Sequence, residues 1–221
     1  MRAVIFANGI IKHLSEPGAV IMPDDLIIAA DGGMHHCQAM GITPSVVIGD
    51  FDSLDPDELN KLQSSGVEII QYPARKDQTD LELALELAVD MAADEILVFG
   101  ALGGRWDMSI ANILLLTLSE FSGIKLKFIE ENQEITLLRG GEEFTLNGKK
   151  GDILSLTALD QEVKGVTLSG LEYPLKDSTL QLGSTLGISN VLVEQTATVS
   201  LEKGLLLCVH TSKEFKVPKV I

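Results

Sequence analysis

The sequence predicts an α/β fold in two parts. Residues 1–131 are expected to form a doubly wound, mostly parallel α/β domain, and residues 132–221 an all-β sandwich domain. Short apolar runs alternate with segments of helical period through the first part, whereas after about Asn132 the helical periods disappear and short β-branched runs between glycine turns replace them. With 221 residues the chain is long enough to bury a core in each part.

Six apolar runs in the first part have the length and composition of strands. Runs such as VVIG and ILVFG show no alternation with polar residues, which is typical of strands buried on both faces of a parallel sheet. The expected strands are Ala3–Ala7, Leu26–Ala30, Val46–Ile48, Val67–Tyr72, Ile96–Phe99 and Lys125–Ile129.

Capping signals mark two helix starts in the first part, and apolar residues at helical spacing predict a third helix. The segment Asp55–Glu58 offers an N-cap, a proline at the first helical position and an acid three residues after the cap. The segment Thr79–Glu82 has the form of a capping box, and apolar residues follow it at helical spacing. A third helix is expected to begin near Asp107–Ser109.

The second part contains short runs rich in β-branched residues, separated by turn signals such as Asn147-Gly148 and Lys203-Gly204. Strands at this spacing predict a sandwich. The expected strands are Glu134–Leu138, Glu142–Leu146, Ile153–Ala158, Glu162–Leu168, Val191–Thr196, Thr198–Leu201 and Leu205–Thr211.

Composition narrows the possible partners. The formal net charge is −15, and a surface this acidic repels phosphate backbones, so no nucleic-acid partner is expected. No apolar run approaches the ~18–20 residues that a membrane-spanning helix needs, so no membrane partner is expected. Cys37 and Cys208 fit neither a disulfide framework nor metal-ligand spacing, and a cytoplasmic location is expected.

Polar, glycine-bearing segments follow the predicted strands of the first part. In open α/β sheets ligands bind outside the carboxyl ends of the strands, so segments at this edge are candidates for one site. The segments are Asn8-Gly9, Asp31–Gly33, Gly49–Ser53, Arg75–Asp80 and Gly100–Asp107.

The acids Asp50 and Asp52 are spaced so that both carboxylates can reach one hard cation from extended backbone. Mg²⁺ is usually held by one or two carboxylates together with substrate phosphates. A solvated turn with an aspartate cap is the alternative interpretation.

Two further segments carry groups suited to phosphate. Lys76 could contact phosphate and a neighbouring acid could contact metal, although Thr79 by itself is equally typical of a helix cap, with acids in the first turn offsetting the helix dipole. The glycine-rich turn before the third helix lets backbone approach an anion, and Arg105 could clamp a phosphate with two hydrogen bonds. A tight turn with a surface arginine is the alternative here.

Taken together, these motifs resemble those of the thiamine pyrophosphokinase family in order and spacing. The first part contributes ADGG at Ala30–Gly33, IGDFDS at Ile48–Ser53, KDQTD at Lys76–Asp80 and the glycine-rich run at Gly100–Asn112. The second part contributes GLEYPL at Gly170–Leu175 and G-x-S-N at Gly187–Asn190. The resemblance covers nearly the whole chain.

The resemblance implies an enzyme, a thiamine diphosphokinase. The family transfers the pyrophosphoryl group of ATP to the hydroxyl of thiamine, giving thiamine diphosphate and AMP. It also implies Mg²⁺ as cofactor, an α/β domain followed by a β-sandwich, and a homodimer with sites at the subunit interface, to which the sandwich contributes thiamine binding and dimer contacts.

The resemblance assigns roles to particular residues. The expected Mg²⁺ ligands are Asp50, Asp52 and Asp80, and the expected catalytic residues are Lys76, Asp77 and Arg105, with Asp77 the candidate general base. The expected nucleotide-binding residues are Asp31, Gly32, Lys76, Thr79, Gly104, Arg105 and Asp107. The expected thiamine-binding residues are Ser189 and Asn190, with Tyr173 as the aromatic candidate because Val191-Leu192-Val193 follow Asn190.

Three other functions stay open at this point. A related pterin pyrophosphokinase would share the metal and triphosphate acids and differ in the acceptor pocket. A non-catalytic nucleotide-binding sensor would bind ATP without releasing AMP. A structural or partner-binding module would leave the five polar strand-end segments unexplained.

Overall fold

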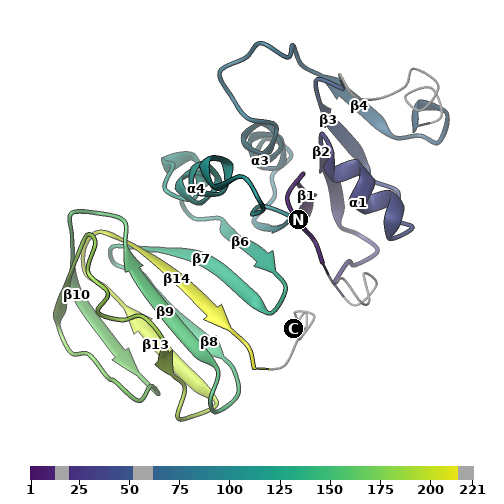
Figure 1. The fold of residues 1–221 in the computed structure, drawn as a ribbon. Coiled ribbons are helices and arrows are strands. Elements are labelled where there is room, and N and C mark those ends of the chain that lie inside the picture. The colour runs from purple at the N-terminus through teal and green to yellow at the C-terminus, as the bar shows by residue number, and fades with distance from the viewer. Residues whose placement is uncertain (13–19, 52–61, 214–221) are drawn as a thin grey trace. The chain divides into compact units, whose positions relative to one another are not determined.

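The computed structural model describes residues 1–12, 20–51 and 62–213, which fall into two compact units (Figure 1). Unit 1 contains Met1–Glu131, and unit 2 begins at Asn132. The expected fold class is confirmed: unit 1 is built on a parallel sheet with helices, and unit 2 is made of antiparallel strands.

The six strands of unit 1 are paired in parallel in the order β6-β5-β1-β2-β3-β4. Their central members are buried along nearly their whole length, as the unbroken apolar runs predict. The strands are β1 (Arg2–Phe6), β2 (Leu26–Ala30), β3 (Val46–Gly49), β4 (Glu68–Gln71), β5 (Glu95–Phe99) and β6 (Lys125–Glu130).

Helices cover both faces of this sheet. Met34 and Cys37 of α1 (Gly33–Ala39) share a buried cluster with Val4 and Ala29, whose neighbours along each strand point to the opposite face. Helix α3 (Asp80–Asp90) contacts β1, β2 and β3 and has no residue in that cluster, so it covers the other face. Figure 1 shows the strands between α1 and α3.

The helix starts follow the capping signals where the structure describes them. The α3 helix begins one residue after Thr79, and α4 (Trp106–Leu115) begins one residue before the expected Asp107. The short helices α1 and η2 (Ser119–Phe121) were not predicted, because neither has a side-chain cap and α1 has only 7 residues. The helix expected from Asp55 lies outside the described residues.

Unit 2 has two antiparallel layers, with strand orders β12-β9-β14-β7 and β11-β10-β13-β8. Alternate residues of each layer face a shared core that includes Leu154, Leu156 and Val199. The strands are β7 (Gln133–Arg139), β8 (Glu143–Asn147), β9 (Ile153–Ala158), β10 (Glu162–Ser169), β11 (Ser178–Gln181), β12 (Asn190–Val191), β13 (Thr196–Ser200) and β14 (Leu205–Thr211).

Two details of unit 2 differ from the sequence prediction. The expected strand Val191–Thr196 is divided, because the chain bends at residues 193–195 as it passes from the layer of β12 to the layer of β13. Strand β11 was not predicted. Only one of its four residues is buried, so its apolar signal is weak.

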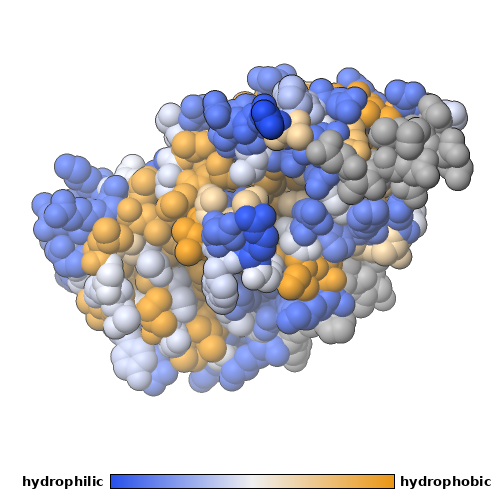
Figure 2. Space-filling model, turned by 45° about the horizontal axis from the view of Figure 1, so that its top comes forward, coloured by the Kyte–Doolittle hydropathy of each residue, from blue (hydrophilic) through white to orange (hydrophobic). Residues whose placement is uncertain are grey.

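Apolar side chains also lie on the surface, and Figure 2 shows such patches among hydrophilic side chains on one face. Trp106, Ile110 and Leu114 are 78%, 56% and 49% exposed and recur every four residues along α4. These three residues are called the α4 stripe below. Within the described residues, no helix is both long and apolar enough to cross a membrane.

Candidate active site

A pocket of about 410 Å³ lies at the carboxyl edge of the parallel sheet of unit 1. The segments after β1, β2 and β5 and the first turns of α3 and α4 form its wall. Asn8 and Asp31 line it from the strand ends, while Thr79, Asp80 and Arg105 line it from the two helix starts. The segments after β1, β2 and β5 and the end of the segment Arg75–Asp80 therefore converge, whereas the described residues of Gly49–Ser53 do not line the pocket.

Asp31 directly follows β2 in a left-handed backbone conformation and lines the pocket. Its φ is +46°, and its N–H donates to the carbonyl of Ile48 at 2.7 Å. Asn8 Nδ2 donates to Asp31 Oδ2 at 3.4 Å. A Cβ on Gly32 would lie 2.2 Å from Asn8 Oδ1, so glycine at this position makes room for Asn8.

The start of α3 brings a lysine against an aspartate. Thr79 Oγ1 accepts a hydrogen bond from the N–H of Glu82 at 3.2 Å, as a capping residue does. Lys76 Nζ lies 2.8 Å from Asp80 Oδ1, and the two side chains are only 15% and 28% exposed. The ammonium of Lys76 therefore offsets the charge of Asp80 at the pocket wall, whereas Asp77 is exposed.

Of the three expected metal ligands, the structure describes two, and only one of these lines the pocket. Asp80 lines the pocket, Asp50 follows β3 outside the pocket lining and Asp52 lies outside the described residues. Over residues 1–12, 20–51 and 62–213, no three His, Cys, Asp or Glu side chains gather in a group that could hold a metal ion.

The glycine-rich segment after β5 packs against the segment after β1, main chain to main chain. The N–H of Gly9 donates to the carbonyl of Gly100 at 2.8 Å, and the N–H of Ile10 donates to the carbonyl of Leu102 at 2.9 Å. A Cβ on Gly9 would lie 2.2 Å from the oxygen of Leu102. No larger residue fits this approach.

The same segment is also fixed to α4. Ser109 Oγ accepts from the N–H of Gly103 at 3.1 Å, and Asn112 Nδ2 donates to the carbonyl of Ala101 at 2.6 Å. Ser109 and Asn112 are both buried and both line the pocket. Asn112 is the last residue of the glycine-rich family motif, but the sequence analysis assigned no role to it or to Ser109.

Glu130, at the end of β6, supplies a third attachment for the glycine-rich segment. Its Oε1 accepts a hydrogen bond from the N–H of Leu102 at 2.9 Å. Burial raises the pKa of Glu130 to about 7, although main-chain N–H groups of Leu102 and Ala101 lower it in part. Sequence reasoning missed Glu130; its position directly after the expected strand Lys125–Ile129 is the signal that could have found it.

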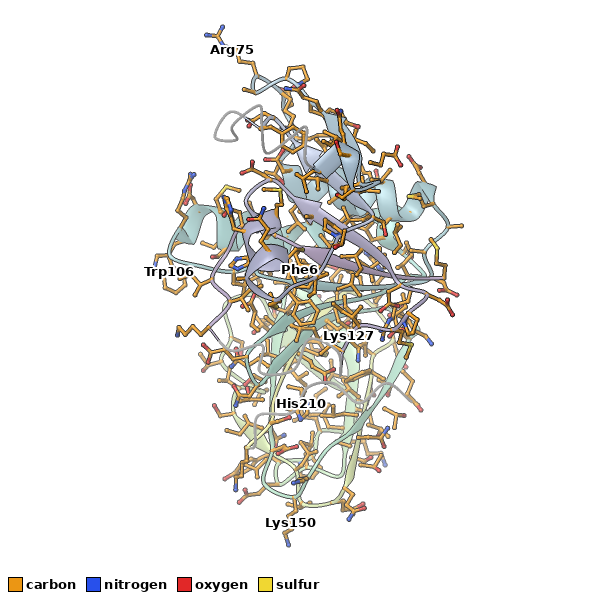
Figure 3. All side chains as sticks on the ribbon, turned by 90° about the vertical axis from the view of Figure 1, so that its right-hand side faces the viewer. Phe6, Arg75, Trp106, Lys127, Lys150 and His210 are labelled. Atoms are coloured by element: carbon orange, nitrogen blue, oxygen red, sulfur yellow. The ribbon has the colours of Figure 1, made fainter. Side chains whose placement is uncertain are left out.

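Arg105 and Asp107 form a pair at the start of α4. Arg105 Nε donates to Asp107 Oδ1 at 3.3 Å, and a second hydrogen bond joins Nη2 to Oδ2. This pairing is the main cause that lowers the pKa of Asp107. Trp106 projects outward at the edge of the view in Figure 3. The pair is exposed, so Arg105 can exchange Asp107 for an anionic ligand.

In unit 2 the three expected thiamine-binding residues lie together. Asn190 Nδ2 donates to the carbonyl of Tyr173 at 2.7 Å, and Asn190 Oδ1 accepts from the N–H of Tyr173 at 3.0 Å. The N–H of Ser189 donates to Ser155 Oγ at 3.0 Å, and Ser189 itself has a φ of +59°. Asn190 is buried, whereas Ser189 and the ring of Tyr173 are exposed.

The two cysteines are buried and free. Burial raises the pKa of both the Cys37 and the Cys208 thiol to about 12. Both stay protonated near neutral pH, which agrees with a packing role.

Two family models match most of the chain. The model for the catalytic domain of thiamin pyrophosphokinase matches residues 19–128, and the model for the vitamin B1 binding domain of that enzyme matches residues 142–206. The chain belongs to the thiamine pyrophosphokinase family. The two matched ranges fall in unit 1 and unit 2 respectively.

Curated relatives carry the same family name. The thiamine pyrophosphokinase of Bacillus subtilis is 34% identical over 187 residues, which cover 85% of this chain and 87% of that protein. Thiamine pyrophosphokinase 1 of Oryza sativa is 27% identical over 176 residues, or 76% of this chain and 66% of that protein.

Solved structures of the family have the same fold. The thiamin pyrophosphokinase of Geobacillus thermodenitrificans aligns with a TM-score of 0.83 at 29% identity, covering 97% of this chain and 99% of that chain. The Bacillus subtilis structure aligns with a TM-score of 0.82 at 30% identity, covering 97% and 100%. The yeast enzyme, at 16% identity over 99% of this chain and 87% of that chain, shares the fold with a TM-score of 0.74.

Proposed function

We propose that this member of the thiamine pyrophosphokinase family transfers the pyrophosphoryl group of ATP to the hydroxyl of thiamine, forming thiamine diphosphate and AMP. One observation carries the proposal beyond the family name. The N-termini of α3 and α4 both open onto the pocket of unit 1, where Thr79 and Arg105 are their N-cap residues. Two helix N-termini with a glycine-rich approach suit a polyphosphate.

The nucleotide is assigned to this pocket. Lys76 and Arg105 supply positive charge from the starts of the two helices, and the main chain around Gly104 can approach phosphate oxygens closely. Asp31 and Gly32 are assigned to the nucleotide end of the pocket with Asn8, and Asp107 holds Arg105 until the phosphate arrives.

Mg²⁺ is the cofactor in this proposal, and the donor chemistry fits it. Asp80 offers a carboxylate at the pocket, Asp50 follows the adjacent strand β3, and Asp52 completes the set suggested by the sequence. One or two carboxylates plus phosphate oxygens form the usual Mg²⁺ environment. When bound, the ion would neutralise charge on the phosphates. Lys76 would hold Asp80 in position.

The reaction requires attack on the β-phosphorus of ATP. The hydroxyl oxygen of thiamine forms a bond to that phosphorus while the bond from it to the α-phosphate oxygen breaks, so AMP leaves and the hydroxyl proton is released. Asp77, exposed beside the pocket-lining start of α3, is the proposed acceptor of that proton. Positioning and charge neutralisation supply most of the catalysis in reactions of this type.

Thiamine is assigned to unit 2, at Ser189, Asn190 and Tyr173. The match of the vitamin B1 binding domain model to residues 142–206 supports this assignment. The exposed Tyr173 ring offers a face for an aromatic cation, and Ser189 offers an exposed hydroxyl.

A homodimer is part of the proposal. The α4 stripe exposes three large apolar side chains on one helix face of unit 1, and Leu182, Leu186 and Ile188 are similarly exposed in unit 2. Exposed apolar side chains gathered in this way mark interaction surfaces. A cytoplasmic location is consistent with two buried, free cysteines.

The deciding experiment is incubation with ATP, Mg²⁺ and thiamine, followed by chromatography. Equal amounts of AMP and thiamine diphosphate are expected. ADP as the nucleotide product would overturn the proposed reaction. AMP formation with a hydroxymethyl pterin but not with thiamine would assign the acceptor pocket to the related pterin enzymes, and binding of ATP without AMP release would indicate a nucleotide sensor.

A further inference from the structure

The glycine-rich segment Gly100–Gly104 has few main-chain groups left free. The segment after β1 binds its carbonyls at Gly100 and Leu102, and α4 binds the carbonyl of Ala101 and the N–H of Gly103. The N–H of Leu102 is bound instead by a side chain that comes from 28 residues away, the carboxylate of Glu130. Glu130 lies between the two ranges matched by the family models.

We propose that Glu130 is a positioning residue for nucleotide binding: its carboxylate fixes Leu102 and thereby holds the glycine-rich segment in the arrangement that receives the phosphates of ATP. This inference rests on the proposed function, because it takes ATP as the ligand of the pocket. Glu130 does not line the pocket, so it acts through Leu102 and the segment rather than by contact with the nucleotide.

The charge of Glu130 is part of this role. An ionised carboxylate accepts a shorter and stronger hydrogen bond from an N–H group than a neutral acceptor does. Burial disfavours that ionised form, and the pKa of about 7 means that Glu130 gains a proton as the pH falls below neutrality. The neighbouring Glu131 also raises this pKa by its charge, and Lys12 pairs with Glu131 at 3.1 Å.

Burying a charged carboxylate at this position lowers the stability of the folded chain, and a neutral acceptor would avoid this cost. A neutral glutamine at the same place could accept the N–H of Leu102 without a buried charge. We therefore infer that the stronger hydrogen bond from a carboxylate to Leu102 serves ATP binding rather than the stability of the folded chain. This difference provides the test.

Three variants separate the charge from the hydrogen bond. Glu130→Gln keeps an acceptor and removes the charge, Glu130→Ala removes both, and Glu131→Gln removes the same charge one residue along the chain as a matched control. Steady-state KM values for ATP and for thiamine are measured for each, together with ATP binding followed by the fluorescence of Trp106. This residue is the single tryptophan of the chain and stands next to the segment.

At about pH 8 the KM for ATP is expected to rise by about tenfold in Glu130→Ala and by about threefold in Glu130→Gln, because the lost interactions correspond to roughly one hydrogen bond. The KM for thiamine should stay within about twofold in all variants, and Glu131→Gln should resemble the parent chain. The lower KM for ATP of the parent chain relative to Glu130→Gln should disappear toward about pH 6, because Glu130 itself is protonated there.

A wild-type KM for ATP in a folded Glu130→Ala chain would overturn the inference, as would an equal effect from Glu131→Gln. Should Glu130→Ala fail to fold, the pH dependence of Glu130→Gln decides: a constant ratio to the parent chain between about pH 6 and about pH 8 would also overturn it. A chain that binds ATP with the expected order of affinities but forms no thiamine diphosphate would contradict the proposed function alone.

Discussion

The side-chain amide of Asn190 forms two hydrogen bonds with the main chain of Tyr173. Its amide donates to the Tyr173 carbonyl at 2.7 Å and accepts from the Tyr173 N–H at 3.0 Å, and the same oxygen accepts from the N–H of Val191 at 3.0 Å. Asn190 is 3% exposed, whereas Tyr173 is 64% exposed. The oxygen of the amide therefore accepts two hydrogen bonds within unit 2 and the nitrogen donates one to Tyr173, so the expected influence of Asn190 on thiamine passes through the placement of Tyr173.

Asn190→Ala should weaken thiamine binding with little effect on ATP. The change removes the hydrogen bonds that orient the Tyr173 segment, each contributing roughly 0.5–1.5 kcal/mol. The KM for thiamine is expected to rise by about tenfold, since about 1.4 kcal/mol corresponds to one decade. Steady-state kinetics with each substrate varied in turn measures both values.

A double-mutant cycle shows whether Asn190 acts through Tyr173. Tyr173→Ala alone should raise the KM for thiamine, and adding Asn190→Ala to it should have almost no further effect, because the two residues form one unit. Additive losses would mean that Asn190 contacts thiamine by itself. Ser155→Ala, which removes the acceptor for the N–H of Ser189, tests separately whether the placement of Ser189 contributes to thiamine binding.

Asp80→Asn should nearly abolish turnover while the fold is retained. The substitution keeps the shape of the side chain but removes the negative charge that pairs with Lys76 and would bind the proposed Mg²⁺. Even outer-shell partners of a metal ligand cost about 10- to 100-fold when mutated, so a greater loss is expected here. Glu82→Gln, in the first turn of the same helix, is the control. Wild-type turnover in Asp80→Asn would remove Asp80 from the metal site, and Asp52→Asn should behave like Asp80→Asn.

Much of this site could be predicted from the sequence because it consists of strand ends and helix starts. The buried run before Asp31 and the capping box at Thr79 fix where polar residues emerge, and both lie at the pocket. The partner of Glu130 could not be predicted in the same way, because Leu102 is 28 residues away and is reached only when β5 and β6 pair. The hydrogen bonds between Asn190 and Tyr173 could not be predicted either, because they join two segments that come together only in the folded unit.

The α4 stripe predicts association of two chains. Light scattering should report about twice the 23.8 kDa mass of one chain. Replacing Ile110 and Leu114 by glutamate should shift the mass toward the monomer, because charged side chains are costly within an apolar interface. Gln38→Glu, at an exposed position of α1, adds charge outside α4 and should leave the mass unchanged. A monomer for the unmodified chain at working concentration would contradict the proposed homodimer.

Glu130→Gln should make the chain more stable at high pH even though it weakens ATP binding. Burial raises the pKa of Glu130 from 4.5 to about 7, so the folded chain holds this proton more tightly than the unfolded chain does. The favourable contribution of protonated Glu130 is complete below about pH 4.5 and is lost as the pH rises to about 7. At about 1.4 kcal/mol for each unit of pKa, ionisation costs the folded state roughly 3 kcal/mol.

Denaturant unfolding of Glu130→Gln and the parent chain at about pH 5 and about pH 8 should show the variant gaining stability relative to the parent chain at the higher pH. An unchanged difference between the two chains would mean that Glu130 titrates as an exposed carboxyl group, and it would remove the physical basis for a charge-dependent hold on Leu102.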